Sequence, residues 1–223
     1  MEWQPEIVDP ERRLALAYAP REWRRALALL WALDERLGAI VAATREPMLG
    51  EIRLAWWRDR LAAIDIRALA GEPLLEGLEP IARLCRLSPN ELARLPQGWM
   101  ALLGALPLER GALLAHGDER GGVLFRLSAR LLGMDHAAAA DAGAAWALLD
   151  IAARFRDPST VTLARALAAE KLGNVQGTSW PRPLRPLAVL MALARLDSRA
   201  GSRRRQGSPR RLATALWAGV TGR

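Results

Sequence analysis

The chain has 223 residues, of which 51% are hydrophobic and 5% aromatic, so it is long and apolar enough to bury a core and is not a disordered protein. Cys85 is the only cysteine, which excludes an internal disulfide and a cysteine-ligated zinc site. The formal charge of +8 suggests an anionic partner, but Lys171 is the only lysine, and we favour an Ala-, Leu- and Arg-rich composition as the origin of the basicity.

Helical periodicity extends over nearly the whole chain, and no window alternates with the period of two that a strand requires. Pro20 and Pro47 begin the first two long helices, because proline is favoured in the first helical turn. These helices are expected over residues 21–43 and 48–64. Shorter helices are expected over residues 74–84, 89–95 (with Ser88 as the cap), 97–106 and 120–132.

Asp135 is the expected N-cap of an alanine-rich helix that extends to about Arg156. Helices over residues 160–172, 187–196 and 212–218 follow. The sequence therefore predicts a single-domain, all-α helical bundle over residues 1–198, followed by a basic loop and a short C-terminal helix in residues 199–223.

The stretch EPMLGEIRLAWWRDRLA, residues 46–62, combines adjacent tryptophans with three arginines. Trp56 and Trp57 point about 100° apart on a helix, so burying both requires a wide apolar face. Arg53 and Arg60 fall inside that face, which predicts that two guanidinium groups point inward. The solvent side is expected to hold Glu51, Ala55, Arg58, Ala62 and Asp65.

The first long helix also carries an inward charge, because Asp34 lies in its apolar stripe. A buried carboxylate must be paired, and the short connection AATREP makes the two helices antiparallel neighbours. We therefore expect Asp34 to pair with Arg53 or Arg60, with tryptophan rings covering the guanidinium groups. Either this ion pair only fixes the register of the two helices, or Arg53 and Arg60 line an anion-binding lumen and bind a diphosphate.

A second group of chemically active residues lies in AWALLDIAARFRDP. Trp146, Asp150 and Asp157 share one helix face, and Arg154 follows Asp150 by four residues, the spacing of a local ion pair. Two inward carboxylates suit a divalent cation, but one helix supplies too few ligands for a diphosphate–magnesium cluster.

The remaining polar features give weaker indications. His116 and His136 lack the spacing of a metal site or a catalytic triad, and HGDERGG is expected to be a hinge or a helix cap. The arginines of residues 199–211 form a solvated loop or contact acidic lipid headgroups, and nucleic-acid binding is not favoured because no binding module accompanies them.

The sequence starts without a signal peptide, so we expect a cytoplasmic protein with peripheral contact to the inner membrane.

Several stretches of the chain resemble the squalene/phytoene synthase family. RRALALLWALDERLGAI and REPMLGEIRLAWWRDRL are similar to the first helical pair of its short bacterial and mitochondrial members. GGVLFRLSARLLG and AGAAWALLDIAARFRDP are similar to the next block and the second active-site helix, and PRPLRPLAVLMALARLD to the C-terminal part. The resemblance implies the all-α isoprenoid-synthase fold. Active members join two prenyl diphosphates head to head, using two aspartate-rich motifs that hold magnesium.

The chain departs from the family at both motifs. The resemblance places the aspartates of the first motif at Gly38, Ala39 and Ala42, none of which can bind a metal. It places those of the second motif at Arg154 and Pro158. DPSTVTLA stands where the family has tyrosines and a glycine–arginine pair.

These departures predict a non-catalytic protein that needs no cofactor and binds a protein partner or an isoprenoid-like lipid. Divergent family members include an assembly factor for respiratory complex I, which implies an assembly-factor-like role. The alternative is an active prenyl-diphosphate head-to-head transferase, in which Asp34, Asp150, Asp157 and Glu119 form an irregular magnesium site. That alternative predicts that the four carboxylates converge in one cavity.

Overall fold

The computed structural model describes residues 5–64, 71–201 and 205–223, and every regular element within these ranges is a helix. The all-α class predicted from the sequence is therefore confirmed. Asp65, expected on the solvent side of its helix, and residues 202–204 of the basic loop lie outside the described residues.

Proline or a capping side chain begins most of the helices, as the sequence predicted. Pro10, Pro47 and Pro209 each occupy the first turn of a helix, where the missing N–H has no intrahelical partner to lose. In chain order the elements are α1 (Pro10–Leu16), α2 (Arg21–Ala43), α3 (Pro47–Ala62), α4 (Pro73–Leu84), α5 (Pro89–Met100), α6 (Arg110–Ala115), the π-helical segment η1 (His116–Gly122), α7 (Val123–Leu131), α8 (Ala139–Arg154), α9 (Pro158–Asn174), the 3-10 turn η2 (Arg182–Leu184), α10 (Arg185–Ala200) and α11 (Pro209–Thr221).

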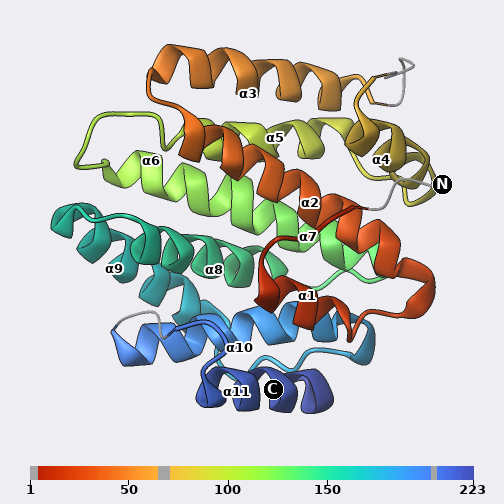
Figure 1. Ribbon diagram of the computed structural model, residues 1–223. Coiled ribbons are helices and arrows are strands. Elements are labelled where there is room, and N and C mark those ends of the chain that lie inside the picture. Colours follow the sequence, from red (N-terminus) through yellow and green to blue (C-terminus); the bar gives the residue numbers. More distant parts are fainter. Residues whose placement is uncertain (1–4, 65–70, 202–204) are drawn as a thin grey trace.

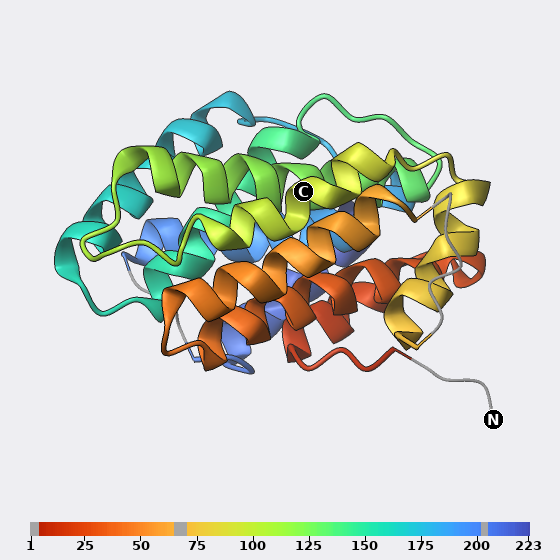
Figure 2. The same cartoon turned by 90° about the horizontal axis from the view of Figure 1, so that it is seen from above.

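The helices stack in layers, with α3 at one end of the stack and α11 at the other (Figure 1). α3 packs chiefly on α5, η1 packs on α5 and α8, and α10 carries α11. Seen from above, α3 and α5 cover the near face of the bundle, while α4 closes one end of it (Figure 2). This layering places α2, η1 and α8 in the interior.

The core between the layers is built mainly from leucine and alanine. Trp31 of α2 is fully buried, and its indole N–H donates to the hydroxyl of Ser128 in α7 over 3.1 Å. Ser128 in turn donates to the carbonyl of Leu124, so both polar groups are satisfied without water. Leu27, Leu30 and Leu37 of the apolar stripe predicted for residues 21–43 are fully buried, and α2 also buries Leu29 and Leu33 outside that stripe.

The segment HGDERGG is π-helical and lies inside one continuous helix, so the predicted hinge or cap is wrong. The glycines serve close packing instead. A Cβ on Gly121 would lie 2.1 Å from the carbonyl oxygen of Gly143, which brings the backbones of η1 and α8 into contact. The π-helical turn is thereby pressed against α8.

Other differences from the expected elements are local. α1 was not predicted, and Pro96 lies inside α5 instead of dividing it into two helices. Asp135 does not cap α8, which begins at Ala139 with Ala138 in the cap position. Within the described ranges, no helix is long and apolar enough to cross a membrane.

Candidate functional site

Asp34 of α2 is fully buried and is bound by side chains from three other elements. Arg120 of η1 donates from Nε to Oδ1 over 3.0 Å and from Nη2 to Oδ2 over 3.2 Å. Arg12 of α1 pairs with Oδ2, and the indole of Trp99 in α5 donates to Oδ1 over 2.8 Å. Burial alone would raise the pKa of Asp34, but the charges of Arg120 and Arg12 outweigh it and hold that pKa well below its usual range.

The ion pairs continue from Arg120 into α8. Nη1 of Arg120 donates to Oδ2 of Asp150 over 3.0 Å, and Nε of Arg154 donates to Oδ1 over 2.9 Å. We call Arg12, Asp34, Arg120, Asp150 and Arg154 the ion chain. It joins α1, α2, η1 and α8, and Glu35, whose Oε1 lies 3.8 Å from Nε of Arg12, balances the third arginine.

Arg120 occupies the middle of the ion chain in an aromatic cage. Its guanidinium carbon lies 4.0 Å from the ring centroid of Trp99 and 4.7 Å from that of Trp146. Nε2 of His116 lies 3.2 Å from Nη1 of Arg120, and Nδ1 lies 2.8 Å from the carbonyl oxygen of Gly98. Because arginine only donates, Nε2 accepts and Nδ1–H donates, which describes a neutral imidazole. Burial and the charge of Arg120 lower the pKa of His116 to about 3.

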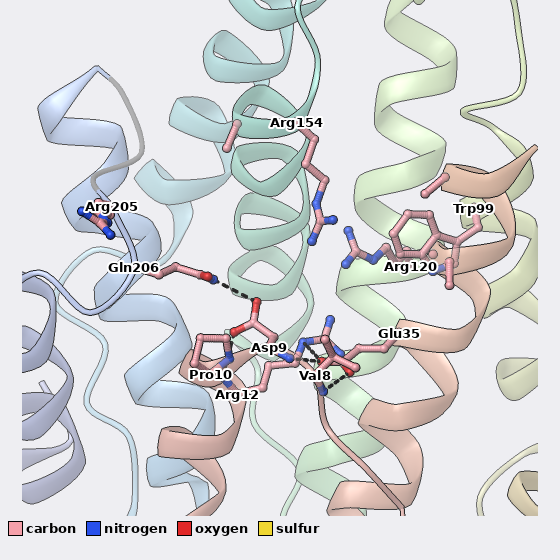
Figure 3. A pocket seen from close by; sticks show the side chains of 14 residues that line it. Val8, Asp9, Pro10, Arg12, Glu35, Trp99, Arg120, Arg154, Arg205 and Gln206 are labelled. Atoms are coloured by element: carbon pink, nitrogen blue, oxygen red, sulfur yellow. Dashed lines mark hydrogen bonds and ion pairs between the residues drawn. The ribbon is translucent and has the colours of Figure 1, made fainter.

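A cleft of about 690 Å³ opens beside the ion chain, between α2, α8 and the segment before α1 (Figure 3). Small side chains form much of its wall, since Gly38, Ala39 and Ala42 come from α2 and Ala153 from α8. The other lining residues are Val8, Asp9, Pro10, Arg12, Glu35, Trp99, Arg120, Arg154, Arg205 and Gln206.

Arginine supplies the accessible charge of this cleft. The side chain of Arg154 is 55% exposed and points toward Arg120, while Arg205 lies on the opposite side of the cleft (Figure 3). Glu35 accepts the backbone N–H of Val8 over 2.7 Å and that of Asp9 over 3.2 Å. Its carboxylate is thus occupied in anchoring the segment before α1, and the arrangement favours an anionic ligand.

The predicted partners of Asp34 are wrong, because α3 turns a different face to the core. α3 buries a stripe that includes Leu54, Trp57 and Leu61, whereas Arg53 is exposed. Trp56 is 42% exposed, and the guanidinium of Arg60 stacks on its ring at 5.3 Å from the centroid. The predicted stacking of a tryptophan ring on an arginine is therefore present, but it lies at the surface and does not involve Asp34.

Trp146, Asp150 and Arg154 meet at the site as their spacing in α8 suggested. Asp150 and Arg154 form the i,i+4 ion pair, and Trp146 covers Arg120. Arg53, Trp56 and Trp57 instead line a separate groove of about 620 Å³ between α2 and α3. The candidate residues of α3 and those of α8 therefore belong to different cavities.

Sequence reasoning missed Arg12, Arg120 and Trp99, which complete the site. Asp9 accepts the amides of Glu11 and Arg12 and so caps α1, a proline-led capping pattern that could have revealed this helix. Arg120 lies four residues after His116, inside the glycine-rich segment interpreted as a hinge. No local sequence pattern distinguishes a π-helical turn that carries a buried arginine from the glycine-rich hinge or cap that the sequence suggested.

The four carboxylates of the alternative magnesium site do not form one cluster. Glu119 pairs with Arg94, and Asp157 accepts the backbone N–H of Thr160 over 2.7 Å as the N-cap of α9. Across residues 5–64, 71–201 and 205–223, three or more His, Cys, Asp or Glu side chains nowhere approach closely enough to hold a metal ion. The donors that face the cleft therefore do not fit a magnesium cluster.

The fold is an all-α bundle of the isoprenoid-synthase type, with its cleft between α2 and α8. The family model for squalene/phytoene synthase matches residues 7–157, more than half of the chain. This chain therefore belongs to the squalene/phytoene synthase family. Comparisons with curated proteins and with solved structures gave no match.

Proposed function

We propose that this chain is a non-catalytic family member that binds an anionic, isoprenoid-like lipid in the cleft without a divalent cation. One observation carries the proposal. Of the five positions at which the resemblance places metal-binding aspartates, all but Pro158 line the cleft, as Gly38, Ala39, Ala42 and Arg154. Small apolar side chains and a cation therefore face the ligand where carboxylates would hold magnesium.

Arginine can neutralise a phosphate or diphosphate directly, because its planar guanidinium donates two parallel hydrogen bonds to anionic oxygens. Arg154 and Arg205 reach the cleft from opposite sides. Ala39 lines both this cleft and the groove formed with Ile52 and Trp56, so an apolar surface suited to an isoprenoid chain lies next to the cationic one. These features support headgroup binding by arginine and chain binding by α2 and α3.

The enzymatic alternative would require Asp34 and Asp150 to bind a metal. Both carboxylates are hydrogen-bonded to Arg120, which is 1% exposed. Their transfer to a metal would strand that guanidinium in the core without a counter-charge, which is strongly unfavourable. The geometry thus argues against the head-to-head transferase.

Calorimetric titration with farnesyl diphosphate, in EDTA and in magnesium, tests the proposal. We expect equal affinity in the two buffers and an affinity about 10- to 100-fold lower for Arg154→Gln, since one charge-assisted contact contributes about 1.5–3 kcal/mol. Arg83→Gln, in an exposed pair with Glu79 on α4, is the matched control and should bind normally. Release of pyrophosphate at an enzymatic rate would refute the proposal, as would binding that requires magnesium.

A protein partner, as in an assembly-factor-like role, is the second candidate. The observation that favours it is the outer face of α3, where Met48 is 70% exposed, Ile52 59% and Trp56 42%. If a partner binds there, Met48→Ser/Leu49→Ser would abolish co-purification of that partner. Leu49 is 48% exposed, and because neither residue lines the cleft or the α2–α3 groove, farnesyl diphosphate binding should stay intact. If co-purification survives this change, the α3 role is wrong.

A further inference from the structure

The net positive charge of the chain is concentrated in its last quarter. Residues 172–223 contain ten arginines and a single acidic residue, Asp197, whereas residues 1–171 carry 22 Lys and Arg against 23 Asp and Glu. Asp197 pairs with one of the ten, Arg211. A composition bias alone would spread basic residues evenly, so this distribution indicates that the part containing α10 and α11 meets something anionic.

α11 packs on the protein with its small residues. Ala215, Ala218 and Gly219 are buried, and a Cβ added to Gly219 would lie 2.2 Å from the ring of Tyr18. α11 rests on α10 and α1 through this narrow, small-residue face. Its large apolar side chains therefore lie on the face that is turned away from α10 and α1.

The outward face of α11 is apolar. Leu212 is 44% exposed, Leu216 51%, Trp217 67% and Val220 67%. At about 100° per residue these four side chains span about 140° of the helix, and no charged residue falls between them. α11 is the outermost layer at its end of the stack, so the face is open (Figure 1). A contiguous exposed apolar face of this kind marks a site of contact with a membrane or another protein.

An arginine-lined groove adjoins this face. Arg21, Arg182 and Arg185 line a cavity of about 850 Å³, with Val220 of α11 on its rim. Nη1 of Arg185 donates to the carbonyl of Gly219 over 2.8 Å, while its buried Nε makes no hydrogen bond to any described residue. Arg21 and Arg182 are exposed, so the groove presents guanidinium donors beside the exposed Val220, as a phosphate headgroup above an acyl chain would require.

We propose that the outward face of α11 docks on an anionic lipid bilayer, with Leu216, Trp217 and Val220 in the interfacial region and the arginine groove on lipid phosphates. Aliphatic residues and a tryptophan flanked by arginine are what an interfacial helix presents to such a surface. A second copy fits poorly, because it would bring two faces carrying the same excess of arginine together. The inference is independent of the ligand in the cleft between α2 and α8.

Flotation of the full chain with vesicles tests this docking. We expect binding to phosphatidylglycerol–phosphatidylcholine vesicles, at least tenfold weaker binding to pure phosphatidylcholine, and weakening in 0.5 M salt. Leu216→Ser/Trp217→Ser should reduce binding at least tenfold without altering the circular dichroism spectrum. Met48→Ser/Leu49→Ser is the matched control on the exposed face of α3 and should float like the unmodified chain.

Quenching of tryptophan fluorescence by brominated lipid locates the contact. We expect quenching in the unmodified chain and a smaller effect in Trp217→Phe, which keeps an apolar side chain and should still bind. Absence of vesicle binding would overturn the proposal. Vesicle binding that Leu216→Ser/Trp217→Ser leaves unchanged would also overturn it, as would undiminished quenching in Trp217→Phe. A third contrary result would be a dimer of the unmodified chain that the double serine variant dissociates, together with no binding to vesicles.

Discussion

Asp34 is the single carboxylate between two buried guanidinium groups, those of Arg12 and Arg120. Among the described residues, Asp34→Ala would leave Arg120 paired with Asp150 alone and Arg12 paired only with Glu35, over 3.8 Å, so we expect the free energy of unfolding to fall by about 3 kcal/mol. Asp59→Ala removes an exposed aspartate that pairs with Arg58 on α3, and should change stability by less than about 1 kcal/mol. Urea denaturation of both variants measures the difference, and similar midpoints would contradict the assigned role of Asp34.

Protonation of His116 should make the free energy of unfolding depend on pH, and it does so at higher pH than protonation of Asp34. Its pKa is lowered to about 3 from an ordinary value of 6.5, so the unfolded chain takes up the proton first as the pH falls. The free energy of unfolding should therefore decrease below pH 6.5, by about 1.4 kcal/mol per pH unit. Asp34 contributes stability that is complete above its ordinary pKa of 3.8 and is lost only as the pH falls below it.

Chemical denaturation between pH 4.5 and 7.5 separates these effects. His116→Gln should remove most of the slope, while His136→Gln, outside the ion chain, should keep it. A slope that survives His116→Gln would assign the pH dependence to another group.

Single residues of the site were predictable only where a local pattern identified them. Asp34 was recognisable as a carboxylate in an apolar stripe, and Arg154 as the i,i+4 partner of Asp150. The partner of Asp34 was not predictable, because Arg120 lies 86 residues away in the chain and reaches it through a π-helical turn. Such pairing depends on which helices pack together, and periodicity does not encode that.

At the scale of elements, the contact between η1 and α8 depends on two glycines. A Cβ on Gly121 would lie 2.1 Å from the carbonyl oxygen of Gly143, so Gly121→Ala must separate the two helices and displace Arg120 from Asp150. We expect a loss of about 2–3 kcal/mol, at the upper end of overpacking changes. In Gly111→Ala no atom lies within 4 Å of the new methyl group, so stability should stay equal or rise slightly.

Thermal unfolding compares the two alanine variants. Equal midpoints would show that η1 and α8 can move apart freely. A tryptophan emission change in Gly121→Ala that is lost when Trp99→Phe is added would locate the disturbance at the rings that enclose Arg120.

Most helices were predictable because proline and capping side chains mark their starts, as for α2 and α3, both found within a few residues of the expected bounds. The buried face was predictable only where a helix has one apolar side. α3 exposes Ile52 and buries Leu54, and α11 exposes Leu216 and buries Ala215. A periodic pattern assigns the larger residues inward, so it fails for helices whose outer face is apolar as well.

On the scale of the whole molecule, the last helices are tied to the first. Arg211 of α11 is 2% exposed and pairs with Glu11 of α1 and Asp197 of α10. Burial lowers the pKa of Arg211, but the hydrogen bonds that its guanidinium donates to both carboxylates raise that pKa by more, so the guanidinium stays charged. This contact holds α11 against the bundle and fixes the direction of its outward apolar face.

Arg211→Ala should therefore loosen α11 while the rest of the bundle stays folded. Removing the cation leaves Glu11 and Asp197 largely buried, each 12% exposed, which we expect to cost about 2–3 kcal/mol because some water still reaches them. Arg210→Ala changes the exposed neighbour and should alter stability by less than about 0.5 kcal/mol. Hydrogen exchange measures the effect where it arises: amides of α11 should exchange faster in Arg211→Ala and normally in Arg210→Ala, with α2 and α8 protected in both. Uniform acceleration across all helices would mean that Arg211 supports the entire core, and unchanged exchange in α11 would mean that the apolar packing on α10 is sufficient.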